Sequence, residues 1–330
     1  MAQRAPSPVP ARPTDPASDA MVRAVGLRKT YPGRRGAPGF TAVDGIDVTV
    51  RRGETFGFLG PNGAGKSSTM RMIGCVSPPS SGELTILGLD AAAHGPRIRA
   101  RMGSVPQDDT LDAELTVREN LHIYGRYFRL PRDIVRRRAV ELLEFARLVD
   151  KADDRVQALS GGMRRRLTIA RSLINSPDIL LLDEPTTGLD PQARHLLWER
   201  LFELKRSGVT LLLTTHYMDE AEQLCDRLVI MDGGRIVAEG SPRSLIEQHV
   251  SREVLELLGT PGTQADTARR IAGVVARVEV LPDRVLCYTA DGERTLADVH
   301  ARGIRPDEAI VRRASLEDVF LRLTGRSLIE

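Results

Sequence analysis

The chain has 330 residues, of which 41% are hydrophobic, 28% are charged and only 4% are aromatic. This length allows one large domain and a smaller one, and the apolar content is sufficient for a packed core. A net charge of +3 gives no indication of nucleic-acid binding, and no apolar run approaches the ~18 residues of a membrane span, so any membrane role requires a partner.

The first twenty residues are rich in Pro, Ala and Ser and contain no hydrophobic segment. We therefore interpret residues 1–20 as a disordered tail rather than a signal peptide. The three cysteines, Cys75, Cys225 and Cys287, are widely spaced and odd in number. This pattern is typical of reduced thiols and not of a disulfide framework or a metal site.

Two alternating segments, 22–31 and 43–50, are predicted to pair as an antiparallel layer, with a Gly/Pro/Arg-rich loop over 32–39 between them. A short buried strand over 54–59 follows, and a helix is predicted over 67–73. The loop that joins this strand to this helix reads Gly60-Pro61-Asn62-Gly63-Ala64-Gly65-Lys66-Ser67-Ser68.

This loop is a complete G-x-x-x-x-G-K-S phosphate-binding motif. Its glycines allow backbone N–H groups to turn toward a phosphate, and the helix N-terminus adds a partial positive charge. We expect Lys66 to reach the β- and γ-phosphates and the Ser67 hydroxyl to hold Mg²⁺. Only four of the 47 basic residues are lysine, yet lysine occupies this position. A compact ammonium fits a crowded phosphate cradle better than a guanidinium does.

The remaining pattern predicts strands over 83–87, 103–106, 179–183 and 210–215, helices over 117–129, 134–148, 161–174 and 192–205, and a hairpin over 228–238. A boundary falls near His249. Residues 253–323 then read strand, helix, strand, strand, helix, strand and helix. That order indicates a small ferredoxin-like appendage.

The strand over 179–183 ends in two acidic residues. Asp183 can hold Mg²⁺ through its water shell, and Glu184 can polarise a water for in-line attack on the γ-phosphate. Two acids after a strand are a weak signal on their own, because strands often end in charged turns. Together with the phosphate loop they predict ATP hydrolysis.

A rarer motif, Leu159-Ser160-Gly161-Gly162-Met163, opens the helix over 161–174. With it, the sequence resembles the ATP-binding subunits of ATP-binding-cassette (ABC) transporters, over about residues 22–245. Further family motifs occur in order: Gln107 as the Q-loop glutamine, Gly188-Leu189-Asp190 as the D-loop, Thr214-Thr215-His216 as the switch-histidine loop and Tyr31 as the aromatic residue that stacks on adenine.

The resemblance implies an α/β P-loop NTPase with a mixed central sheet, an antiparallel β layer and a helical subdomain. It places this ABC ATPase domain at residues 21–249, with the helical subdomain at about 108–175 and an α+β appendage at 250–330. It also implies ATP and Mg²⁺ as cofactors, with Mg²⁺ held by Ser67, Gln107 and Asp183, and catalysis by Glu184, His216 and Lys66.

In this family two copies meet head to tail around two ATP molecules. The resemblance therefore implies that Ser160, Gly161 and Gly162 of one copy cap the γ-phosphate held by Lys66 of the other, where a helix N-terminus again meets an anion. His216 would contact the γ-phosphate, Gln107 would sense it and its metal, and Asp190 would cross the interface.

Two assignments have alternatives. The loop over 32–39 is longer than the family usually has, so Phe40 competes with Tyr31 for the stacking role. The run Arg164-Arg165-Arg166 could form a nucleic-acid patch. Because three consecutive residues spread around a helix axis, we interpret them as a solvated face.

Closer similarity links the chain to ABC-2-type exporter ATPases, including the nodulation lipo-oligosaccharide and daunorubicin-type drug-resistance exporters. It rests on residues 56–59, 116–121, 124–128 and 317–325. It implies a peripheral ATPase at the cytoplasmic face of the cell membrane. There a homodimer would drive a separate ABC-2-type permease, docked at residues 107–129, to export drugs, lipids or glycolipids. The sequence identifies neither the cargo nor the permease.

The alternative is a soluble ABC ATPase that acts on ribosomes or nucleic acid. Translation-associated members carry two cassettes in one chain, and this chain has one. DNA-repair members insert coiled coils or zinc modules between the motifs, and none is visible in this sequence. A regulatory module without turnover is also less favoured, because Glu184 is intact. We therefore expect no nucleic-acid partner.

Overall fold

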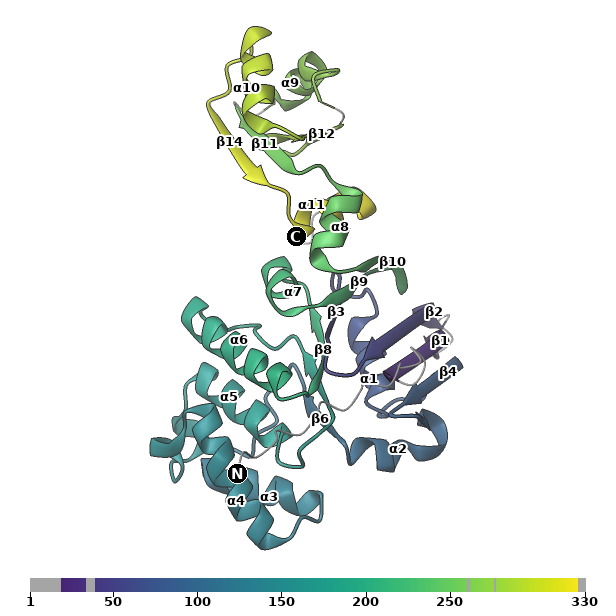
Figure 1. Cartoon of the computed structure of the whole chain (residues 1–330), viewed down its shortest axis with the longest axis vertical. Coiled ribbons are helices and arrows are strands. Elements are labelled where there is room, and N and C mark those ends of the chain that lie inside the picture. The colour runs from purple at the N-terminus through teal and green to yellow at the C-terminus, as the bar shows by residue number, and fades with distance from the viewer. Residues whose placement is uncertain (1–18, 34–38, 260–261, 276, 326–330) are drawn as a thin grey trace, which may run out of the picture.

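The computed structural model describes residues 19–33, 39–259, 262–275 and 277–325. Within these ranges the chain forms three sheets and their covering helices (Figure 1). Residues 1–18 of the tail interpreted as disordered over 1–20, and most of the predicted loop over 32–39, lie outside the described residues. The end of that tail is corrected, because Ala20 begins the first strand, β1 (Ala20–Tyr31).

A six-stranded sheet with the order β10-β9-β3-β8-β7-β6 forms the centre of the main domain. Its strands are β3 (Thr55–Leu59), β6 (Met102–Val105), β7 (Ile179–Asp183), β8 (Thr210–Thr215), β9 (Arg227–Asp232) and β10 (Arg235–Gly240). All neighbouring strands are parallel except β9 and β10, which form the predicted hairpin. The carboxyl ends of β3, β7 and β8 therefore lie at one edge of the sheet.

The helices that flank this sheet are α1 (Lys66–Ile73), α6 (Pro191–Arg206), α7 (Met218–Leu224) and α8 (Pro242–His249). Strands β3 and β8 are buried at every position, as expected of parallel strands with both faces covered. The sequence pattern did not predict α7 and α8, which are only seven and eight residues long.

The antiparallel layer has the strand order β2-β1-β4-β5. Its strands are β1 (Ala20–Tyr31), β2 (Phe40–Arg51), β4 (Ser81–Ile86) and β5 (Leu89–Asp90), followed by the unpredicted α2 (Ala91–Arg99). Side chains of this layer share a hydrophobic core with β3 and α1, including Val22, Val48, Phe56 and Met70. The layer is thereby attached beside the phosphate loop, as the sequence predicted.

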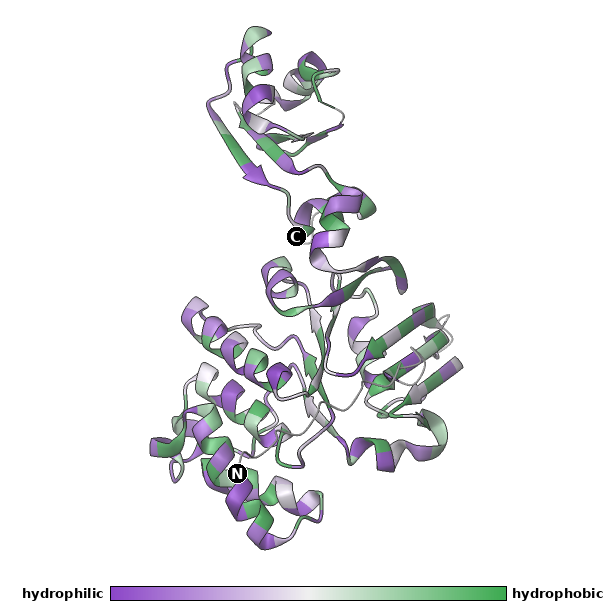
Figure 2. Cartoon of the chain, in the orientation of Figure 1, coloured by the Kyte–Doolittle hydropathy of each residue, from purple (hydrophilic) through white to green (hydrophobic). Residues whose placement is uncertain are grey.

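The helical subdomain contains α3 (Val117–Tyr127), α4 (Arg132–Ala146) and α5 (Gly161–Ser172). Helix α3 begins with a capping box in which Thr116 and Glu119 satisfy each other's backbone N–H groups. Figure 2 shows both hydrophilic and hydrophobic residues along these helices, as expected of helices that pack by one face. Their buried side chains, such as Leu121, Leu142 and Leu167, join the large core that also contains β7 and β8.

The appendage has a four-stranded sheet with the order β12-β13-β11-β14, and all of its neighbouring strands are antiparallel. Its elements are β11 (Glu253–Leu258), α9 (Gln264–Ile271), β12 (Arg277–Val280), β13 (Arg284–Thr289), α10 (Gly292–Ala301), β14 (Glu308–Arg313) and α11 (Leu316–Thr324). This order confirms the ferredoxin-like prediction. Helix α11 returns to α7 and α8, and its Leu316, Val319 and Phe320 are buried in the main core.

Candidate active site

The phosphate loop joins β3 to α1 at the edge where the parallel strands end. Gly63 and Gly65 have φ of 82° and 101°, which side chains rarely adopt. A Cβ atom at Gly60 would lie 2.3 Å from the Met231 carbonyl oxygen, and one at Gly65 would lie 2.3 Å from that of Ala42. These close carbonyl oxygens leave room only for glycine at positions 60 and 65.

Lys66 is buried, with 4% of its surface exposed, and its ammonium closes over the loop. Its Nζ donates to the carbonyl oxygens of Gly60 at 2.6 Å and Pro61 at 3.0 Å, and lies 3.9 Å from Glu184 Oε1. Burial lowers the pKa of Lys66, while the carboxylates of Glu184 and Asp183 act in the opposite direction. The loop lysine and the acids after β7 therefore face the same small volume.

Ser67 and Asp183 meet at the start of α1. Ser67 Oγ donates to Asp183 Oδ1 at 3.2 Å, and Thr214 Oγ1 from β8 donates to the same oxygen at 2.5 Å. A hydroxyl and a carboxylate beside a phosphate loop are hard oxygen donors that suit Mg²⁺, which uses few protein ligands together with phosphates and waters. The donor set present therefore fits the expected metal.

Glu184 is 7% exposed and has a φ of 45°, an uncommon backbone conformation for a residue that is not glycine. Its N–H donates to the carbonyl oxygen and to Oγ1 of Thr214, both at 3.1 Å. Its carboxylate accepts hydrogen bonds from Gln107 Nε2 at 3.1 Å and from Thr187 Oγ1 at 3.2 Å. These contacts fix the direction of the carboxylate.

His216 follows β8 and points toward the same acid. Its Nδ1 lies 3.3 Å from Glu184 Oε1, and its ring centroid is 4.1 Å from that of Tyr217. The structure thus brings together Lys66, Ser67, Asp183, Glu184 and His216 from three strand ends, with Gln107 reaching in from the segment after β6. This is the arrangement expected from the order of the motifs.

Tyr31 lies beside the same loop. Its hydroxyl is 3.2 Å from Ser68 Oγ, and the Lys29 ammonium is 5.1 Å from the centre of its ring. Phe40 pairs with Tyr31 across β1 and β2 and is 61% exposed. Both aromatic residues are therefore near the loop, and Tyr31 is the one that contacts it.

The signature residues and Asp190 form a separate group. Ser160 caps α5 by accepting a hydrogen bond from the Met163 N–H at 3.3 Å, and Asp190 caps α6 in the same way through Ala193 at 2.9 Å. A Cβ at Gly162 would lie 3.1 Å from Ala193 Cβ, whereas one at Gly161 would meet nothing within 4 Å. In the described part of the chain, no hydrogen bond joins this group to the phosphate loop.

The interpretation of Arg164 to Arg166 as a solvated face is wrong. Arg165 points inward and donates to the backbone oxygens of Pro106 (2.5 Å), Gln107 (3.4 Å), Asp183 (3.0 Å), Glu184 (3.1 Å) and Pro185 (2.8 Å). Burial lowers the pKa of this guanidinium, and nearby acids, Glu220 first, offset part of the effect. Arg166 donates to the Ala146 carbonyl oxygen, and Arg164 pairs with Asp109 at 3.2 Å.

Glu220 on α7 is a second residue that the sequence analysis missed. It is fully buried, and within the described residues neither of its carboxylate oxygens has a hydrogen-bond partner. The same holds for Thr186 Oγ1 and Trp198 Nε1. Burial raises the pKa of Glu220, while the polar groups of Thr215, Thr186 and Trp198 act in the opposite direction. No sequence signal marks a buried acid on so short a helix.

Comparison with known proteins agrees with this geometry. Residues 43–187 match the ABC transporter family, and residues 264–325 match the family described as the C-terminal domain of nodulation factor export protein NodI. The chain is 51% identical over 310 residues to a Nod factor export ATP-binding protein I of Ralstonia nicotianae, which covers 92% of this chain and 93% of that protein. A protein of the same name from a Rhizobium species is 52% identical over 287 residues, or 87% of this chain and 93% of the relative.

Among solved structures, the chain is similar to a dimeric ATP-binding cassette in a post-hydrolysis state with ADP and Pi. The TM-score is 0.61 and the identity 30%, over 67% of this chain and 98% of that one. Among the helices that the structure describes, none is both long and apolar enough to cross a membrane. The chain therefore belongs to the ABC transporter family, as an ATP-binding and ATP-hydrolysing subunit of the nodulation-type export ATPases.

Proposed function

We propose that the cluster around Glu184 is the hydrolytic centre. Lys66 and the loop N–H groups would bind the β- and γ-phosphates, and Tyr31 would stack on adenine. Ser67, Asp183 and Gln107 would hold Mg²⁺, which would supply positive charge to offset the negative charge of the phosphates. The carboxylate of Glu184 supports this role most directly, because it is buried and aimed by two hydrogen bonds.

In this proposal Glu184 accepts a proton from the attacking water, while Lys66 and His216 stabilise the charge on the transferring phosphoryl group. His216 Nδ1 lies 3.3 Å from Glu184 Oε1, so both side chains face the same small volume. The φ of 45° at Glu184 is a strained backbone conformation of the kind that clusters at active sites.

We further propose that two copies close head to tail over two ATP molecules. Ser160 and Gly161 are exposed, and the N-terminus of the 12-residue helix α5 presents backbone N–H groups that suit an anion. Within its own chain this group contacts α6 instead of the phosphate loop. A second copy would supply the γ-phosphate, as the dimeric relative with ADP and Pi suggests.

A separate permease of the ABC-2 type is the proposed membrane partner. A groove of about 920 Å³ lies between α1, β6 and α3, and the site residues Ser67, Gln107 and Asp183 line it. Its rim carries Tyr127 and Val76, which are 73% and 74% exposed. Exposed aromatic and apolar residues around a groove are typical of an interface anchor site. A permease segment in this groove would respond to changes at the nucleotide.

The relatives are named for Nod factor export. On that similarity we propose a lipo-oligosaccharide or related glycolipid as cargo, and the cytoplasmic face of the cell membrane as the location. We keep residue 249 as the proposed boundary between the ATPase domain and the appendage.

The test of this assembly is co-purification of the full chain from membranes, followed by cysteine cross-linking. Single cysteines at Val76 and Tyr127 should cross-link to the cytoplasmic loops of the co-purified permease, and a cysteine at exposed Arg294 in the appendage should not. Cross-links from Arg294 alone would overturn the docking assignment.

A further inference from the structure

The segment 126–138 is unusually basic. Six arginines and one aspartate give it a net charge of +5, which leaves −2 for the rest of the chain. Five of these arginines are exposed, and we call them the arginine patch: Arg126, Arg129, Arg132, Arg136 and Arg137. The sequence analysis did not single them out.

The patch is not neutralised by neighbouring acids. In the described part of the chain, none of its five members takes part in an ion pair. The sixth arginine of the segment, Arg138, lies outside the patch and pairs with Glu141 at 3.0 Å. Another exposed arginine of the same subdomain does have a partner, since Arg155 pairs with Glu114 at 3.6 Å. An ordinary solvated surface mixes both signs of charge evenly, whereas here the exposed Asp133 is the one acid among five exposed arginines in residues 126–138.

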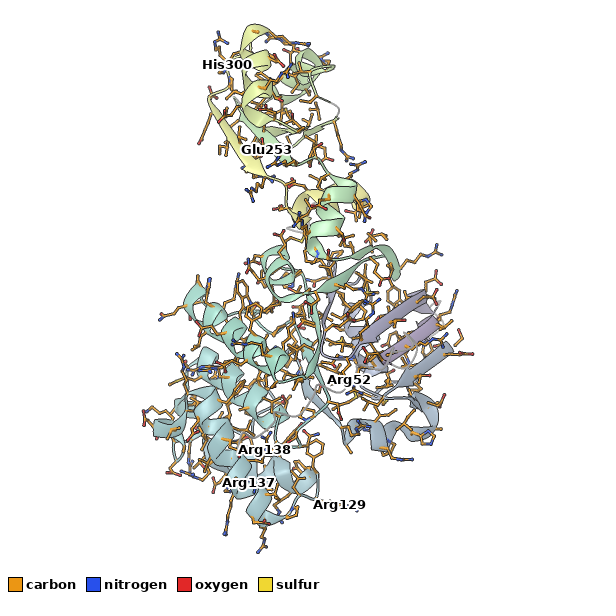
Figure 3. All side chains as sticks on the ribbon, viewed as in Figure 1. Arg52, Arg129, Arg137, Arg138, Glu253 and His300 are labelled. Atoms are coloured by element: carbon orange, nitrogen blue, oxygen red, sulfur yellow. The ribbon has the colours of Figure 1, made fainter. Side chains whose placement is uncertain are left out.

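The patch occupies one end of the molecule. It runs from the last turn of α3 through the connecting turn into the first turns of α4, where Arg132 and Arg136 are one helical turn apart. Figure 3 shows Arg129 and Arg137 at the end of the molecule opposite His300 of the appendage. Exposed Tyr127 and Val140, at 73% and 50%, lie within the same stretch.

We propose that the arginine patch contacts the anionic phospholipid headgroups of the membrane. The proposal rests on the proposed docking groove, because Tyr127, Phe128 and Arg129 line that groove and a permease segment that enters it comes from the bilayer. The patch beside the groove then faces the membrane surface. Clustered arginines are attracted to anionic lipid, and tyrosine is enriched at membrane interfaces.

A lipid surface fits these residues better than a folded protein partner does. The arginines lie on an outer turn and a helix face, and the large apolar side chains exposed within this stretch are Tyr127, whose ring packs edge-on against Tyr124, and Val140. Each arginine near an anionic surface contributes ~1 kcal/mol, so several together give measurable attachment without a shaped pocket. The attraction should weaken as salt shortens the Debye length.

The experiment is co-sedimentation of the full chain, without nucleotide, with vesicles of phosphatidylcholine alone or of a two-to-one mixture with phosphatidylglycerol. The test variant replaces Arg132, Arg136 and Arg137 with Gln. The control variant carries Gln in place of three exposed arginines elsewhere on the chain, Arg23, Arg206 and Arg294. Within the described residues, these three make no side-chain ion pair. The two variants have equal net charge, and unchanged ATPase rates would show that both are folded.

The wild type should bind the anionic vesicles and not the neutral ones. Loss of the three patch arginines should weaken this binding roughly 100-fold, and the control less than about tenfold. Equal weakening by both variants, or equal binding of the wild type to both vesicles, would overturn the proposal. If the patch variant kept its vesicle binding but no longer co-purified with the permease, the patch would instead be a contact with that protein. If the patch-dependent vesicle binding were found but cysteines at Val76 and Tyr127 did not cross-link to the permease, only the proposed docking groove would be contradicted.

Discussion

Gln107 Nε2 donates a hydrogen bond of 3.1 Å to Glu184 Oε2, so the segment that enters the helical subdomain holds the candidate base. Arg165 strengthens this link, because one guanidinium binds the backbone oxygens of both Pro106 and Glu184. A movement of the helical subdomain would therefore move the carboxylate. Under the proposed docking, a partner in the groove beside Gln107 would thereby control hydrolysis without touching ATP.

Replacement of Arg165 by Ala should impair turnover more than nucleotide binding. The change leaves several backbone oxygens near the site without their charged donor, and each such hydrogen bond contributes about 1.5–3 kcal/mol. We expect phosphate release to fall roughly 10- to 100-fold with a smaller change in the Kd for ATP. The control is Arg164→Ala, which removes a partly exposed ion pair with Asp109 and a hydrogen bond to the Leu159 carbonyl oxygen but no contact with Asp183 or Glu184. Equal effects of the two changes would contradict the assignment.

Mixed dimers test the head-to-tail arrangement. A Lys66→Ala chain and a Ser160→Ala chain should each be inactive alone, because both sites of each dimer lack one group. Mixing them should restore phosphate release, since one site of the mixed dimer has both groups intact. The control mixture combines Lys66→Ala with Glu184→Gln, where every site remains damaged. No recovery in the first mixture would argue against a shared site.

Glu220→Gln should stabilise the protein at neutral and alkaline pH. The folded-state pKa of Glu220 is raised by burial, so the folded chain binds a proton that the unfolded chain releases, and stability falls as pH rises through that range. Arg165 and Asp219 are the charged groups near it. Urea unfolding should show a stabilising difference that grows from about pH 4.5 upward and disappears below it. A difference that is constant with pH would contradict the buried neutral acid.

The three thiols should differ in reactivity. Burial raises the pKa of Cys287 to about 12 and raises that of Cys225 as well, and both side chains are inaccessible. Cys75 is only partly buried, although burial also raises its pKa. At mildly alkaline pH one thiol per folded chain should react slowly with a disulfide reagent, and Cys75→Ser should abolish the reaction. Rapid reaction of all three in the folded chain would contradict the structure.

Local patterns were sufficient for the strands and for the order of the motifs. β7 and β8 begin and end where the sequence indicates, because apolar runs of this length bounded by turns have few alternatives. Helix α2 was missed because Gly95 and Pro96 interrupt its pattern and His94 is not helical. Helix α7 is too short to show a helical period.

The roles of Arg165 and Glu220 could not be predicted for a different reason. Whether an arginine in a run of three faces solvent or the interior depends on how α5 is rotated against β7, and that rotation follows from packing of the whole subdomain. Likewise, the burial of Glu220 depends on α6 and on the segment after β7. Long-range packing decided both cases, whereas the phosphate loop and its acids are encoded by local sequence.

The most direct test of the whole account is the Glu184→Gln variant, because it keeps the shape of the carboxylate and removes its basicity. We predict that the variant binds ATP with Mg²⁺ about as well as the wild type does. Its steady-state phosphate release should fall by ~10²–10⁴-fold. Turnover close to that of the wild type would contradict the assignment of Glu184 as the catalytic base.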